Sequence, residues 1–92
     1  FDKVSVYLDE RKVVGQLVLR KVTATDRIAP IGMKGTQLVT KVLKDAGYSL
    51  QERADFYVVA DEQEVIWIPN IKVSRNKLAQ ANAVNCLQLS LK

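Results

Sequence analysis

The residues best suited to chemistry in this chain lie between residues 25 and 35, in a loop that carries two cations, Arg27 and Lys34. Guanidinium and ammonium groups suit phosphate, because both donate charge-assisted hydrogen bonds to its oxygen atoms. The loop also contains Gly32 and Gly35, and glycine permits positive φ angles or a close approach of the backbone to a ligand. We therefore interpret the segment as an anion-binding loop. The alternative is an ordinary connection whose glycines only form turns.

Residues for other kinds of chemistry are absent or isolated. The sequence contains no histidine, and its single cysteine, Cys86, is interpreted as a small residue at the start of the last strand. The four glycines do not have the spacing of a nucleotide-binding loop. Asp61, Glu62 and Glu64 lack the spacing of a calcium loop and are expected to form a solvated hairpin turn. We therefore predict no catalytic residue, cofactor site or metal site in this chain.

The composition is that of one small globular domain spanning residues 1–92. Hydrophobic residues make up 48% and charged residues 26%, which allows a modest core. The net charge of +4 favours an anionic partner. One cysteine and no apolar run of about 20 residues indicate a cytoplasmic, reducing environment and no membrane partner. The chain begins with Phe1 rather than methionine, so we expect a piece of a longer protein.

Two helical segments are expected after the loop. Thr36 is a suitable N-cap for a helix whose apolar positions follow helical spacing, and Gly47 is a suitable C′ residue. Ser49 and Glu52 have the spacing of a capping box, which predicts a short second helical turn over residues 50–54.

Alternating or β-branched apolar residues predict about six strands, over residues 4–8, 16–22, 56–60, 65–68, 71–73 and 87–92. The segment 78–84 is compatible with a helix or a loop. Trp67 alternates on an apolar strand and is expected in the core rather than as a platform for base stacking. Together these elements predict an α+β domain that is mostly β, with one amphipathic helix covering one face of the sheet.

A combination of short motifs extends through the loop, the helix and the strands beyond them. It consists of Leu19-Arg20-Lys21, Asp26-Arg27, Pro30-Ile31-Gly32-Met33-Lys34-Gly35, Asp45-Ala46, Arg53 and Val65-Ile66-Trp67. In this combination, over roughly residues 17–68, the chain resembles the C-terminal domain of bacterial tRNA(Ile)-lysidine synthetase. The resemblance implies a small sandwich-like β structure with a helix, related to a domain of the phenylalanyl-tRNA synthetase β chain.

The resemblance also implies a function. In that family an upstream domain uses ATP to attach lysine to the wobble cytidine of an isoleucine tRNA, through an adenylated intermediate. The C-terminal domain helps to hold the tRNA at its acceptor stem. The expected partners are therefore the tRNA and the upstream catalytic domain of the same chain. This fragment alone would not be an enzyme, and ATP and lysine would be used upstream.

The candidate RNA contacts are cations and loop residues, namely Arg27, Lys34, Gly35, Thr36, Lys41, Lys44 and Arg53. A helix that begins near Thr36 would add backbone N–H donors for a phosphate group. At the start of this helix the family has paired lysines, where this chain has Gln37 and Leu38. The RNA surface is therefore expected to be reduced, or to shift onto outward lysines, namely Lys41, Lys44 and Lys72.

Structural roles remain open for several of these residues. Arg27 either binds phosphate or holds the loop by pairing with Asp26 or a carbonyl group, and Arg53 either contacts RNA or pairs with Asp55. The two helix lysines are either contacts or simply solvated. For the whole domain, the alternative to RNA binding is a packing module whose loop docks on its own parent enzyme. Salt dependence separates these functions, because phosphate contacts weaken with added salt and apolar docking barely responds.

Overall fold

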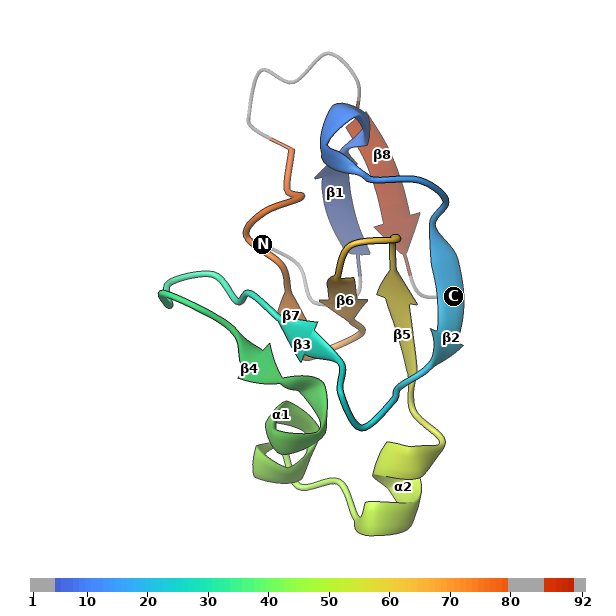
Figure 1. Ribbon diagram of the computed structural model, residues 1–92, viewed down its shortest axis with the longest axis vertical. Coiled ribbons are helices and arrows are strands. Elements are labelled where there is room, and N and C mark those ends of the chain that lie inside the picture. The colour runs from blue at the N-terminus through green and yellow to red at the C-terminus, as the bar shows by residue number, and fades with distance from the viewer. Residues whose placement is uncertain (1–4, 80–85, 91–92) are drawn as a thin grey trace.

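The computed structural model describes residues 5–79 and 86–90, which form short strands and two short helices (Figure 1). The strands are β1 (Ser5–Asp9), β2 (Val18–Lys21), β3 (Arg27–Ile28), β4 (Gln37–Leu38), β5 (Tyr57–Ala60), β6 (Val65–Ile68), β7 (Lys72–Val73) and β8 (Cys86–Ser90). The helices are α1 (Val39–Asp45) and α2 (Leu50–Ala54), and a single 3₁₀ turn spans Glu10–Lys12. The fold is α+β and mostly β, which confirms the prediction from the sequence.

Small antiparallel sheets organise the strands. A four-stranded sheet has the order β2-β5-β6-β7, β1 pairs with β8, and β3 pairs with β4 as a short hairpin. In Figure 1 the β1–β8 pair lies at one end of the molecule, the two helices lie at the other, and the four-stranded sheet lies between them. The β3–β4 loop projects to one side, at the left of this view.

Two hydrophobic clusters hold these layers together. One joins α1, β3 and the four-stranded sheet, and its fully buried members include Ile28, Val39, Leu43, Val58 and Ile68. The other joins β1 to the sheet and contains Leu8, Ile66, Trp67 and Val73. Trp67 is only 3% exposed, which confirms that it belongs to the core. Removal of this apolar surface from water is the main favourable term that fixes the hairpin and α1 on the sheet.

The first helix begins later than predicted, and Thr36 is not its N-cap. The two residues after Thr36 remain extended as β4 and pair with β3. The N-cap of α1 is Leu38, which makes no side-chain capping bond, and the first helical amide, Val39 N, donates to the Asp26 carbonyl at 2.9 Å. Pairing with β3, which carries the fully buried Ile28, therefore overrides the local capping preference of Thr36.

The predicted signals at the end of α1 and the start of α2 are confirmed. Gly47 adopts φ +96°, in the left-handed region that suits a C′ glycine, and Tyr48 N donates to the Leu43 carbonyl at 3.1 Å. At α2, Ser49 N donates to Glu52 Oε1 at 2.8 Å and Glu52 N donates to Ser49 Oγ at 3.1 Å. These two bonds complete the capping box.

The strand predictions are confirmed with changes in extent, although residues 4 and 91–92 of the predicted strands lie outside the described residues. The second strand starts at Val18 rather than at residue 16, and β3 and β4 were not predicted at all. In the segment left open, Leu78 forms an isolated bridge with Leu8, so its start is extended rather than helical. The remainder of that segment, residues 80–84, lies outside the described residues. Cys86 opens β8, as predicted.

The turn between β5 and β6 is exposed at Glu62, as the sequence predicts, but the prediction is wrong for Asp61, which is buried. Its carboxylate accepts hydrogen bonds from Val14 N at 2.9 Å, Gln63 N at 2.8 Å and Glu64 N at 2.9 Å. The Nζ atom of Lys77, a residue that is 3% exposed, lies 3.2 Å away. Burial acts to raise the pKa of Asp61, but these donors outweigh it, so its pKa lies below the ordinary value. The acidic turn therefore anchors the fold.

Candidate nucleic-acid interface

The structure brings the candidate RNA contacts together in two groups. The hairpin loop, residues 29–36 between β3 and β4, carries Lys34, Gly35 and Thr36, with Arg27 at its base. The helix groove, between α1 and α2, is lined by Thr40, Lys41, Lys44, Asp45 and Arg53. Because α1 follows directly on β4, one continuous stretch of chain links the two groups (Figure 1).

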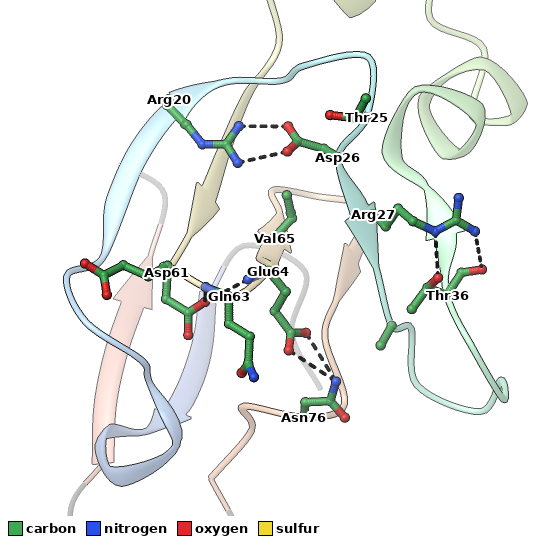
Figure 2. Close-up of a pocket in the computed structure, with 12 residues that line it drawn as sticks. Arg20, Thr25, Asp26, Arg27, Thr36, Asp61, Gln63, Glu64, Val65 and Asn76 are labelled. Carbon is green, nitrogen blue, oxygen red and sulfur yellow. Dashed lines mark hydrogen bonds and ion pairs between the residues drawn. The ribbon is translucent and has the colours of Figure 1, made fainter.

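Arg27 holds the base of the hairpin loop. Its Nε atom donates to Thr36 Oγ1 at 2.7 Å, and its Nη2 atom donates to the Thr36 carbonyl at 3.3 Å (Figure 2). The predicted loop-holding role of Arg27 is therefore observed, although Thr36 rather than Asp26 is its partner. A contact between Arg27 and phosphate remains a prediction.

Asp26 fixes the entry to the loop through Arg20. Arg20 donates two hydrogen bonds to the Asp26 carboxylate, at 2.7 and 2.9 Å, and Thr23 N donates a third at 2.7 Å (Figure 2 shows the arginine pair). Burial acts to raise the pKa of the Asp26 carboxyl, but Arg20 and the Thr23 amide outweigh it and leave the pKa below its ordinary value. The carboxylate is therefore ionised at neutral pH and held in place.

Lys34 is exposed in the turn of the hairpin loop. The flanking Gly32 and Gly35 have φ angles of +80° and +79°, and a Cβ atom added at either position would meet nothing within 4 Å. These glycines therefore serve backbone conformation rather than close packing. They let the chain reverse direction so that the Lys34 side chain is presented to solvent.

The helix groove gathers three of the predicted cations. Lys41 and Lys44 lie about one helical turn apart on the exposed side of α1, and Arg53 reaches the groove from α2. The groove has a volume of about 350 Å³. Asp45 is the acid among its lining residues, so cations outnumber anions there. Such a surface suits the negative charge of phosphate groups.

A nearby backbone carbonyl group holds the Arg53 side chain in place. Its Nη1 atom donates to the Tyr48 carbonyl at 2.9 Å, and the Tyr48 ring packs edge-on against Phe56 with ring centroids 5.2 Å apart. Asp55, the alternative partner predicted for Arg53, is paired with Lys21 at 3.4 Å instead. The guanidinium of Arg53 is therefore held at the groove without a carboxylate partner among the described ion pairs.

The N-terminus of α1, where the sequence predicts a phosphate site, lies at Val39 rather than near Thr36. The helix has seven residues, and its first amide, Val39 N, is already bonded to the Asp26 carbonyl. The Thr36 hydroxyl, which was expected at the N-cap, accepts from Arg27. The first helix amide and the Thr36 hydroxyl are therefore used inside the protein, and phosphate binding by the later amides of α1 stays a prediction.

Two further cations, from the segment around β7, reach the hairpin loop and the adjoining strand β4. The Nη1 atom of Arg75 donates to the carbonyl groups of Pro30 and Gly35, at 3.3 and 2.9 Å. Lys72 Nζ donates to Gln37 Oε1 of β4 at 3.1 Å. Lys72 was expected near the RNA surface, but sequence reasoning missed Arg75. Arg75 lies 40 residues from Gly35 and belongs to no motif, so no local signal identifies it.

A pocket of about 410 Å³ lies between β3 and the β5–β6 turn (Figure 2). In its wall Arg20 forms an ion pair with Asp26, Asn76 donates hydrogen bonds to Glu64, and carboxylates outnumber cations. This wall does not suit phosphate. In the part of the chain that the structure describes, no cluster of three or more His, Cys, Asp or Glu side chains could bind a metal ion. No helix among those residues is long and apolar enough to cross a membrane.

Comparison with known families identifies the chain. A family model described as the TilS substrate C-terminal domain matches residues 17–91. The chain belongs to this family. It is 41% identical over 66 residues to the tRNA(Ile)-lysidine synthase of Bacillus subtilis (strain 168), covering 71% of this chain and 14% of that protein. It is 26% identical over 81 residues to the enzyme of the same name from Caldanaerobacter subterraneus subsp. tengcongensis, covering 88% and 17%. The chain thus spans less than a fifth of the length of these relatives.

Solved structures share the fold of this TilS substrate domain. The crystal structure of a TilS C-terminal domain has a TM-score of 0.80 at 21% identity, covering 100% of this chain and 74% of that one. An N-terminal fragment of the phenylalanyl-tRNA synthetase β-subunit from Pyrococcus horikoshii has a TM-score of 0.70 at 15% identity, covering 91% and 26%. These likenesses concern the fold alone. The family and the structural relation that the motifs implied are both confirmed.

Proposed function

We propose that this chain is the tRNA-binding part of a tRNA(Ile)-lysidine synthase and that it holds the acceptor stem of an isoleucine tRNA. An upstream domain would use ATP to attach lysine to the wobble cytidine of the same tRNA. Membership of the TilS substrate domain family and the names of the relatives support this proposal. The chain itself contributes binding and not chemistry.

The observation that carries the proposal is the gathering of Lys41, Lys44 and Arg53 in the helix groove. Two of these cations stand on one face of α1, and the third comes from a separate helix. A double-stranded RNA stem presents regularly spaced phosphates, and proteins recognise it mainly through its shape, phosphates and 2′-hydroxyl groups. A groove lined by three cations therefore suits the backbone of such a stem and needs no base-specific contact.

Lys34 adds a fourth contact on the hairpin loop, so the interface involves about four phosphates. At about 0.7 to 0.9 per phosphate, four contacts give a log–log slope of binding against salt of about −3. A slope of about −3 lowers affinity roughly 60-fold between 50 and 200 mM salt. The domain alone would therefore bind weakly at physiological salt and would contribute mainly as one linked part of the enzyme.

The test is binding of the 92-residue chain to an isoleucine tRNA and to an acceptor-stem minihelix across a salt series. The Lys41→Ala/Lys44→Ala variant should bind more weakly, with a slope less negative by about 1.4 to 1.8, because two phosphate contacts are removed. The control Lys21→Glu lowers the net charge by the same two units at one exposed position that does not line the groove.

The control variant should keep a slope close to that of the wild type. Equal losses in both variants would mean that net charge rather than the groove determines binding. The proposal would be contradicted if the wild type showed no salt-sensitive binding even at low salt.

A second candidate function, packing against another domain of the parent enzyme, is supported by apolar exposure on the hairpin loop. Ile31 is 52% exposed and Met33 is 41% exposed. In the Ile31→Ser/Met33→Ser variant, RNA binding by the isolated chain should change little if the cations carry the contact. A large loss of stability in the full-length enzyme, with RNA binding by the isolated chain intact, would instead favour the packing function.

A further inference from the structure

The hairpin loop is closed by a side chain from a distant part of the sequence. Arg75 follows β7, and its Nη1 atom donates to the Pro30 carbonyl on one arm of the loop and to the Gly35 carbonyl on the other, at 3.3 and 2.9 Å. Its backbone N–H donates to the Ala29 carbonyl at 2.8 Å. The guanidinium of Arg75 therefore spans the two arms, and Lys34 lies in the turn between them.

Backbone contacts hold the first arm of this loop, because Pro30 forms an isolated bridge with Ser74, but the second arm is weakly held without Arg75. The β3–β4 ladder contains two residue pairs, Arg27 with Leu38 and Ile28 with Gln37. The Arg27 side chain adds bonds to Thr36 at the base. Further out in the loop, Arg75 is the side chain that donates hydrogen bonds to both arms, among the residues that the structure describes. The intervening turn contains glycines with positive φ, which have high conformational entropy when unrestrained.

The backbone that carries Arg75 is held in place by residues that precede and follow it in the chain. On one side, Ser74 is fully buried, and its hydroxyl donates to Glu64 Oε1 at 2.6 Å. On the other side, Lys77 donates to Gln63 Oε1 at 2.7 Å and to the Lys12 carbonyl at 2.8 Å. An arginine whose backbone is fixed in this way can hold a flexible loop in one position, because that backbone does not move with the loop.

We infer that Arg75 is a positioning residue, which holds the hairpin loop in the conformation that presents Lys34 to the RNA backbone. This inference rests on the proposed function of the loop as a phosphate contact. Arg75 acts through the carbonyl groups of Pro30 and Gly35, and its role is to reduce the ordering that the loop must undergo on binding. It is therefore distinct from Lys34, which supplies charge to the interface.

The first test measures loop motion in the free protein. In the Arg75→Gln variant, ¹⁵N relaxation order parameters for the amides of residues 31–35 should fall from the ordered range, about 0.8, to below about 0.6. The control Lys21→Gln removes an exposed cation whose partner, Asp55, is also exposed, and it should leave these order parameters unchanged. Unchanged order parameters in Arg75→Gln, with the fold intact, would overturn the inference.

The second test separates positioning from direct contact. In a salt series with the acceptor-stem minihelix, Arg75→Gln should lower affinity roughly two- to tenfold with an unchanged slope, because ordering one loop costs about as much as immobilising one side chain. Lys34→Ala should instead make the slope less negative by about 0.7 to 0.9, because one phosphate contact is lost. The same slope change in Arg75→Gln would make Arg75 a phosphate contact and overturn its positioning role.

The two proposals can fail separately. If the wild-type chain does not bind RNA, the proposed function is contradicted, and the order parameters still decide whether Arg75 holds the loop. If RNA binds with the expected salt dependence but the order parameters of Arg75→Gln match those of the wild type, the proposed function stands and the role of Arg75 is refuted.

Discussion

Replacement of Asp61 by alanine should remove a large part of the stability of this domain. The Asp61 side chain is fully buried and accepts three backbone hydrogen bonds, and the Lys77 side chain beside it is only 4% exposed. Asp61→Ala would leave those backbone donors without their acceptor and the buried Lys77 ammonium without its nearest anion. Removal of one partner of a buried ion pair typically costs about 3 to 5 kcal/mol.

The lower end of that range applies here, because Lys77 keeps two other acceptors, the Gln63 side chain and the Lys12 carbonyl. We therefore expect Asp61→Ala to lower the free energy of unfolding by about 3 kcal/mol. A domain of this length has a total stability on the order of 5 to 14 kcal/mol, so the loss would be a large fraction of the total. Asp61→Asn keeps one carbonyl oxygen as an acceptor and should fall between the wild type and Asp61→Ala.

The assay is equilibrium unfolding in urea, followed by the fluorescence of the buried Trp67 and by circular dichroism. The matched control is Glu62→Ala, which removes an exposed carboxylate from the same turn and should cost less than about 0.5 kcal/mol. The midpoint should shift without a change in the slope of the unfolding free energy against urea. A cost below about 1 kcal/mol for Asp61→Ala, or an equal cost for Glu62→Ala, would refute the interpretation of Asp61 as an anchor.

Three further measurements test other parts of the fold. The pKa values of Asp26 and Asp61 lie below the ordinary value in the folded protein. Their contribution to stability is therefore present above the unfolded pKa of about 4 and is lost as pH falls through the folded values. Urea midpoints measured across pH should be flat near neutrality and fall below about pH 4. Gly47→Ala forces a Cβ atom into the left-handed region at φ +96° and should lower stability by about 1 kcal/mol, or the melting temperature by about 4 to 8 °C in calorimetry. Ser49→Ala removes the hydroxyl that accepts from Glu52 N and should cost about 1 kcal/mol in urea unfolding, whereas Gln51→Ala on the exposed face of α2 should cost almost nothing.

Elements whose signals are local could be predicted from the sequence. The capping box of Ser49 and Glu52 and the C′ role of Gly47 depend on residues within one helical turn, and both are confirmed. The burial of Trp67 follows from its place in a continuous apolar strand. The motifs along the loop and strands were specific enough to identify the family, which the match over residues 17–91 confirms.

Features that depend on distant partners could not be predicted. Thr36 has the side chain of an N-cap, but the pairing of β3 with β4 delays the helix and gives the Thr36 hydroxyl to Arg27. Asp61 lies in an acidic turn that the sequence predicts to be solvated. Its ion pair with Lys77, a residue that follows β7 in the sequence, could not be predicted from local residues. Arg75 belongs to no motif, and only the fold places it on the hairpin loop. In each case tertiary contacts override a local preference.

The arginines and lysines of this surface have different structural roles, and the difference follows from their side chains. Arg20 and Arg27 each use two guanidinium nitrogens to hold the loop, and Arg75 spans its two arms from one nitrogen, whereas Lys34 and the helix-groove lysines are exposed. A planar guanidinium offers several donors in fixed directions, while an ammonium is a point charge on a flexible stem that follows a phosphate easily. A hydrogen bond to a carbonyl oxygen leaves the charge of a guanidinium in place but fixes its direction, so the arginines of the loop follow a phosphate group less freely than Lys34 does. The proposed contact between Lys34 and RNA therefore depends on arginines that need not touch RNA themselves.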